Sequence, residues 1–213
     1  MCGTSMACPV VTGAAALLKQ YFEDGYYPSG SPNAARGFTP SGALLRAMLC
    51  NGAVNMTGIN GYMGNQEGYG RILLDSNVFL PGDTHRTALA DVSHAQGLSH
   101  GQKKYFSFFV PQGTSELKLT MAFSDEPGAA NASNPVVNDL NIRMRDSQGT
   151  IYAGGILSTS NGEATANPTA QDAKNSIEQI YLTNPPAGKY WIELEGKNIP
   201  QGPQGYAGVL TLS

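Results

Sequence analysis

The residues with the clearest chemical potential lie around Ser5, where the chain reads "GTSMACPVVTGAAALL". The apolar and small residues after Ser5 recur at helical spacing, so we expect Ser5 at or just before a helix start. The free N–H groups and the dipole of a helix N-terminus favour negative charge. The Ser5 hydroxyl could therefore act as a nucleophile in acyl transfer, with its own N–H stabilising the oxyanion. The residues alone leave a simpler interpretation open, in which Ser5 is only a helix N-cap.

Two helices are expected to position this segment. The first covers residues 5–22, and Pro9 fits only because it lies near the helix start. Because Pro9 has no N–H, it also removes the hydrogen bond that the carbonyl of Ser5 would accept. The second helix lies in "FTPSGALLRAMLCNG", with Thr39 as N-cap, Pro40 at the first helical position and Asn51-Gly52 as the stop.

From about Thr84 the pattern changes to the alternation of β-strands. Six segments show it: "KKYFSFFV", "ELKLTMAFSD", "DLNIRMRD", "IEQIYLTN", "GKYWIELEG" and "YAGVLTLS". Short strands separated by Gly, Pro and Asn turns predict an antiparallel β-sandwich. The expected fold class is therefore mixed α and β, with a helical part over residues 1–82 and a β-sandwich domain over residues 83–213.

Composition excludes several classes of protein. A net charge of −3 over 213 residues gives no basic field for nucleic acid. Only 14% of the residues are charged and 41% are hydrophobic, which argues against disorder. No apolar run is long enough to span a membrane, and "MCGTSMACP" lacks the pattern of a signal peptide.

The sequence has three cysteines, Cys2, Cys8 and Cys50, and it leaves open whether two of them form a disulfide. We expect all three to be small, buried packing residues.

The string "GTSMACPVVTGAAALL" resembles the serine motif of the subtilisin-like serine peptidases, G-T-S-M-A-x-P followed by a helix. The segment "GYGRILLD" is similar to the end of that family's catalytic domain. The stretches "VVNDLNIRMRDSQGTIYAGG", "NSIEQIYLTNPPAGKYWIELEG" and "IPQGPQGYAGVLTLS" resemble the jelly-roll-like β-sandwich that follows this domain in one subtilase group. The resemblance thus implies the C-terminal part of an α/β subtilisin-like domain followed by a β-sandwich.

The resemblance implies a serine endopeptidase that cleaves polypeptides without a catalytic cofactor, and an extracellular location. Ser5 is the implied nucleophile, and its backbone N–H is half of the oxyanion hole. The family's Asp, His and oxyanion-hole Asn come earlier in the chain than the Ser, and only four residues precede Ser5 here. We therefore expect a missing N-terminal catalytic region as partner, and we expect this isolated chain to be inactive. The expected helix over residues 5–22 should then expose apolar surface unless a partner segment covers it.

No other base is evident in the sequence. The three histidines, His85, His94 and His100, all follow Ser5 and lie within or beside the predicted sandwich. Asp91 is close to His94 in the sequence, but proximity along a chain is not geometry. We do not expect any of these histidines to be catalytic.

A set of oxygen-bearing side chains at strand ends and turns could hold calcium. Carboxylate and amide oxygens are the ligands that Ca²⁺ prefers. The family resemblance also implies structural calcium, although turns are rich in Asp and Asn for conformational reasons alone. Two alternatives to a serine endopeptidase stay open. The chain could be a non-catalytic β-sandwich module that binds calcium or a protein partner, or a non-catalytic relative that keeps Ser5 by descent. The candidate ligands are Asp125, Asn138, Asp139, Asn175 and Glu178.

Overall fold

The computed structural model describes residues 3–56, 63–64, 66–158 and 160–213. Two α-helices precede the strands, α1 over Thr4–Glu23 and α2 over Gly42–Asn51. The strands are β1 Arg86–Val92, β2 Lys103–Val110, β3 Glu116–Ala122, β4 Asp139–Arg145, β5 Ile151–Leu157, β6 Ala164–Ala166, β7 Ile177–Thr183, β8 Gly188–Asn198 and β9 Tyr206–Leu212.

The strands form two antiparallel sheets. One has the order β1-β9-β3-β7 and the other the order β2-β8-β4-β5-β6. Consecutive strands cross between the sheets as they do in a jelly roll, except that β4, β5 and β6 follow one another within the five-stranded sheet. This confirms the predicted fold class. Six of the strands lie in the six predicted segments, whereas β1, β5 and β6 were not predicted. The Ala-rich β1 and the Gly-containing β5 have weak strand propensity, and β6 is only three residues long.

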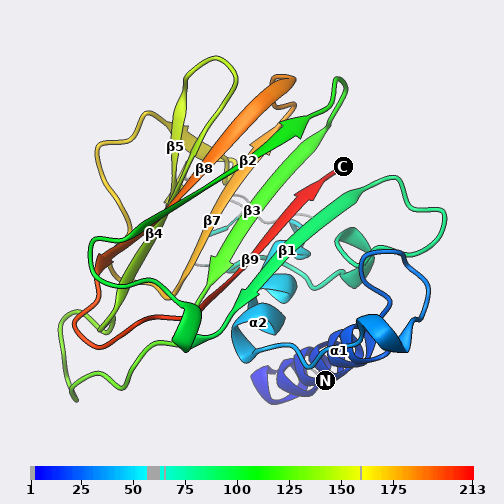
Figure 1. Ribbon diagram of the computed structural model, residues 1–213, viewed down its shortest axis with the longest axis horizontal. Helices are drawn as coiled ribbons and strands as arrows, with labels where there is room; N and C mark the ends of the chain where they lie inside the picture. The colour runs from blue at the N-terminus through cyan, green and yellow to red at the C-terminus, as the bar shows by residue number, and fades with distance from the viewer. Residues whose placement is uncertain (1–2, 57–62, 65, 159) are drawn as a thin grey trace.

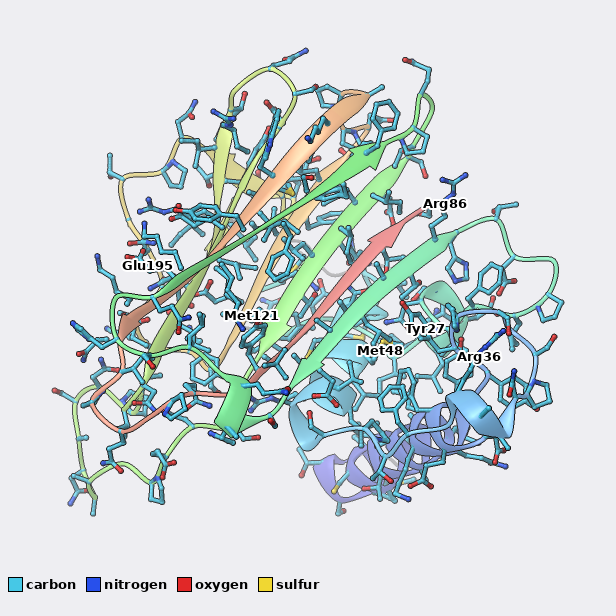
Figure 2. All side chains as sticks on the ribbon, in the orientation of Figure 1. Tyr27, Arg36, Met48, Arg86, Met121 and Glu195 are labelled. Atoms are coloured by element: carbon cyan, nitrogen blue, oxygen red, sulfur yellow. The ribbon has the colours of Figure 1, made fainter. Side chains whose placement is uncertain are left out.

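The elements stack in layers, and in Figure 1 the strands of the two sheets lie beside one another with α1 and α2 at the lower right. Apolar side chains from both sheets, such as Met121 of β3 and Ile142 of β4, fill the first core. Helix α2 covers the outer face of the four-stranded sheet, and α1 packs on α2. Met48 of α2 and Val209 of β9 belong to this second core (Met121 and Met48 are labelled in Figure 2). The second core therefore spans the predicted boundary near residue 82.

The N-terminus of α2 differs from the sequence prediction. Ser41, not Thr39, is the N-cap, because the Ser41 hydroxyl accepts the N–H of Leu44 at 3.0 Å. Ser41 also donates its hydroxyl and its N–H to the two carboxylate oxygens of Asp91 on β1, at 2.6 and 2.8 Å. The Thr39 hydroxyl instead donates to Glu23. The cap was wrongly predicted because its partner Asp91 lies 50 residues further along the chain.

We expect Ser41→Ala to lower the free energy of unfolding by about 1–2 kcal/mol, because it removes the N-cap and one bond to Asp91. Urea denaturation followed by circular dichroism measures the change. Thr39→Ala is the matched control and should change stability by less than about 0.5 kcal/mol, because its hydroxyl lies on the surface. Equal losses for the two variants would contradict the observed cap.

Candidate active site

Ser5 is the second residue of α1, which begins at Thr4, so the predicted helix start is confirmed. The first helical bonds run from the N–H groups of Met6 and Ala7 to the carbonyl of Gly3, at 3.1 and 3.2 Å. The N–H of Ser5 therefore belongs to the first turn, whose donors have no acceptor within the helix. The side chain of Ser5 is exposed. The Ser5 hydroxyl and a backbone N–H without a helical acceptor thus lie together at the positive end of a helix of 20 residues.

Pro9 lies inside α1, four residues after Ser5. Because proline has no N–H, the carbonyl of Ser5 lacks its normal helical donor. The helix still continues beyond this point to Glu23. Pro9 is therefore tolerated near the helix start, as predicted. The first turn of α1 has one backbone hydrogen bond fewer than a turn without proline.

The histidines are engaged elsewhere. The His85 ring is buried and packs edge-on against Phe79, with centroids 6.1 Å apart. The Nδ1 atoms of His94 and His100 accept backbone N–H groups of the sandwich loops at 3.4 and 3.3 Å. In the part of the chain that the structure describes, no side chain forms a hydrogen bond with the Ser5 hydroxyl. No triad is assembled around Ser5 by these residues.

Asp91 does not pair with His94. Both of its carboxylate oxygens bind Ser41 at the start of α2, as described above. Asp91 therefore joins β1 to α2, which is a structural role.

One side of α1 is exposed although it is apolar. Met6, Val10 and Leu17 form a stripe along the helix, here called the α1 stripe, with exposed fractions of 44%, 66% and 60%. The opposite side is buried, and Leu18 and Phe22 are fully inaccessible. The structure confirms the expectation that this helix exposes apolar surface.

The cysteines differ from the predicted buried packing residues. Cys8 is a free thiol on the exposed side of α1, so the prediction is wrong for this residue. Cys50 is a free, half-buried thiol in α2, and burial raises its pKa to about 11. Cys2 lies outside the described residues.

The five candidate calcium ligands fall into two groups. In the first, the Asp125 carboxylate accepts the N–H groups of Glu126, Val137 and Asn138 at 2.7–2.9 Å. The Asn138 side chain is buried and donates to Gln204 at 2.8 Å. These contacts shape the loop that precedes β4.

The second group contains Asp139, Asn175 and Glu178, together with Asp172, which the sequence did not suggest. The Asn175 amide donates to Asp172 at 2.7 Å. Glu178 is fully buried on β7 and accepts the N–H of Ile142 at 2.9 Å. Its other oxygen, Oε1, has no hydrogen-bond partner among the described residues.

The charges of this second group act on one another. Burial raises the pKa of Glu178 well above its usual value, and the charges of Asp172 and Asp139 raise it further. Burial also raises the pKa of Asp139, again with a contribution from Asp172. Within the described residues, no three acidic, His or Cys side chains are arranged to hold a metal ion. Calcium binding stays a prediction.

The raised pKa of Glu178 has a consequence for stability. The folded chain holds this proton more tightly than the unfolded chain, so stability falls as pH rises from about 4.5 towards the folded-state pKa. We expect Glu178→Gln to remove this fall and to raise the melting temperature at pH 8 more than at pH 5. Thermal unfolding at both pH values, in the presence of a chelator, measures the effect.

Repeating the same melts with Ca²⁺ tests the calcium prediction. A rise in melting temperature that Glu178→Gln abolishes would support a calcium site, because the ion needs the carboxylate. Glu126→Gln is the matched control, since Glu126 is half-buried and its carboxylate is not in this group. No shift with Ca²⁺ in the unaltered chain would remove the calcium claim.

Comparison with known proteins finds similarity to one family. Residues 1–97 match the sequence model of the Subtilase family, Peptidase S8. The chain is 29% identical over 222 residues to the serine protease/ABC transporter B family protein tagA of Dictyostelium discoideum, covering 99% of this chain and 12% of tagA. It is 27% identical to tagD of the same organism, covering 96% of this chain and 14% of tagD. The chain thus spans only about an eighth of the length of these relatives.

Similarity to solved structures is weaker. The Bacillus licheniformis lipase BlEst2 in its propeptide form aligns with 60% of this chain and 21% of its own, at 16% identity and a TM-score of 0.32. A similarity at this level says nothing about function.

Neither helix in the described part of the chain has the length and apolar character needed to cross a membrane. The family match, the two serine protease relatives and the exposed Ser5 at the start of α1 agree, and residues 1–97 of this chain resemble the subtilase family.

Proposed function

We propose that this chain is the nucleophile-bearing part of a subtilisin-like serine endopeptidase. The observation that carries the proposal is the position of Ser5, exposed in the first turn of α1 within the segment that matches the family. In the proposed reaction the Ser5 oxygen adds to the scissile carbonyl carbon while a base takes its proton. The N–H of Ser5 stabilises the oxyanion, and collapse of the intermediate expels the amine of the cleaved peptide.

The base that accepts the Ser5 proton is proposed to come from a polypeptide segment outside these 213 residues. Two observations support this. The described residues place no side chain in hydrogen-bonding contact with Ser5, and the three histidines are engaged in or beside the sandwich. By the order of the family's motif, the same outside segment supplies the His, the Asp and the second oxyanion donor.

The α1 stripe is the proposed contact surface for that segment. A helix gains most of its stability by burying an apolar face, and exposed apolar surface commonly marks an interface. The stripe begins one residue after Ser5, at Met6, and reaches Leu17. A segment seated on it would therefore lie next to the nucleophile, where a base has to be.

The stripe gives a testable prediction for the isolated chain. We expect the double variant Val10→Lys, Leu17→Lys to reduce self-association of the purified chain, because two side chains exposed by 66% and 60% lose their apolar surface. Its melting temperature should change by less than about 2 °C, since neither side chain is packed in the described structure. Analytical ultracentrifugation and thermal unfolding measure the two effects.

A matched control uses the buried side of the same helix. Leu18→Ala should lower the free energy of unfolding by about 2–5 kcal/mol, because Leu18 is fully buried in the second core. A large loss of stability in the lysine variant would show that the stripe is already packed and would contradict the proposed contact surface.

The isolated chain provides the direct test of the missing base. A fluorophosphonate probe should not label it, because a serine without a base is a poor nucleophile. Labelling at Ser5 would show that the chain itself supplies a base and would overturn the proposed division of the triad. The extracellular location implied by the family resemblance stays a prediction.

A further inference from the structure

An apolar cavity opens between the two sheets, at the side where β1 and β2 are the edge strands. Its volume is about 210 Å³, and its lining comes from both sheets. The residues that line it include Ala88 and Ala90 of β1, Phe106 of β2, and Tyr206 and Gly208 of β9. None of its lining residues is charged.

The cavity exists because small residues face a large one across the sandwich. On β1, Ala90 pairs with Gly208 of β9, and Ala88 pairs with Leu210. A Cβ atom added at Gly208 would meet no heavy atom within 4 Å, so the space above this residue is empty. Phe106 lines the opposite side and is still 46% exposed. Protein interiors are normally packed without voids of this size, so the open edge is a distinct feature of this sandwich.

Positive charge flanks the cavity at both ends. The Lys104 ammonium lies 5.5 Å from the centroid of the Tyr206 ring, which lines the cavity. Lys104 also donates to the carbonyl of Gln96 at 3.1 Å, which holds the ammonium at this end. At the other end, Arg86 is exposed and lies two residues before Ala88 on β1, hence on the same face of the strand (Arg86 is labelled in Figure 2).

We propose that this cavity binds a small amphipathic anion, specifically a carboxylate with an aryl or branched-alkyl body. An apolar cavity of about 150 Å³ is enough to hold benzene, so a volume of about 210 Å³ takes a phenyl ring with a short linker. The apolar body lies between the sheets against Gly208 and Phe106, and the carboxylate points out of the mouth towards Lys104. This inference does not depend on the chemistry of Ser5.

The test uses the full 213-residue chain and two probes of the same shape, 4-phenylbutyrate and 4-phenylbutanol. Titration calorimetry should show one site that binds the carboxylate about tenfold more tightly than the alcohol. Gly208→Leu fills the cavity and should weaken both probes by at least about tenfold. Gly42→Leu is the matched control, because this glycine also has open space around it but lies at the start of α2, and it should leave binding unchanged.

Two further variants keep the test decisive. Ala90→Val fills part of the cavity with a residue that suits a strand, and it should weaken binding if Gly208→Leu does not fold. Lys104→Gln should abolish the preference for the carboxylate and leave the alcohol unaffected. No binding of either probe to the folded chain, or binding that Gly208→Leu and Ala90→Val leave unchanged, would overturn the proposal. Equal affinity for the two probes would overturn the assignment of an anionic ligand. If the chain forms a dimer that Gly208→Leu dissociates, the cavity is a dimer interface and not a ligand site.

Discussion

Ser5→Ala is expected to lower peptidase activity by on the order of 10⁴-fold or more, when this chain is joined to the segment proposed to supply the His and the Asp. The variant removes the oxygen that is proposed to attack the substrate and leaves α1 intact, because alanine is a good helix former. The loss should fall on kcat and leave KM nearly unchanged, since Ser5 acts on the reacting bond and not on the rest of the substrate. Hydrolysis of a chromogenic peptide by the joined protein measures both constants.

Thr12→Ala is the matched control for this loss. Thr12 also has a hydroxyl on the exposed side of α1, where it donates to the carbonyl of Cys8 at 3.1 Å. Removing that hydroxyl should leave kcat within about twofold, because it is two helical turns from Ser5. Activity that survives Ser5→Ala would mean that the nucleophile is another residue and that the family motif is not used for catalysis here.

Asn51→Leu is expected to lower the free energy of unfolding by about 3–5 kcal/mol. Asn51 is the last residue of α2, and it is only 1% exposed. Its amide donates to the carbonyl of Lys118 on β3 and to the carbonyl of Val209 on β9, at 3.2 and 3.3 Å. Its Oδ1 accepts the hydroxyl of Thr211 at 2.7 Å. This side chain therefore fixes α2 to two strands of the sandwich.

Leucine has nearly the shape of asparagine but no polar atoms, so it removes the hydrogen bonds that the buried Asn51 side chain makes to β3 and β9. Guanidinium denaturation measures the loss. Asn198→Leu is the control, because Asn198 is exposed at the end of β8, and its effect should stay within about 0.5 kcal/mol. If the two variants lose similar amounts, the helical part and the sandwich are held together by packing alone.

The prediction of two helices and an antiparallel sandwich succeeded where the signal is local. The start of α1 follows from Ser5, Pro9 and the apolar spacing after them, all within one stretch of chain. The six predicted strand segments are rich in β-branched and aromatic residues that alternate. In contrast, β1 has three short or polar side chains in its middle, Ala88, Ala90 and Asp91, and becomes a strand only because β9 pairs with it.

The candidate calcium ligands also show that a local pattern does not reveal which distant residues lie together. Asp125 and Glu178 both have the chemistry that calcium prefers, and sequence reasoning grouped them for that reason. In the structure they make different contacts, because Asp125 holds the loop before β4 and Glu178 is buried on β7, where it accepts the N–H of Ile142. The charge of Asp172 raises the pKa of Glu178. The sequence did not suggest Asp172 as part of this group, because a turn residue gives no signal of which strand it faces.

By itself, the sequence determined the resemblance of residues 1–97 to the subtilase family and the helix that carries the candidate nucleophile Ser5, because a family motif and a helix start depend on neighbouring residues. Only the tertiary structure decided that Asp91 binds the N-cap Ser41 of α2 instead of a histidine, that Asn51 joins the helical part to the sandwich, and that an apolar cavity lies beside Gly208. Each of these depends on contacts between residues far apart in the chain. Such contacts are set by how the layers pack, and no local pattern of residue types records them.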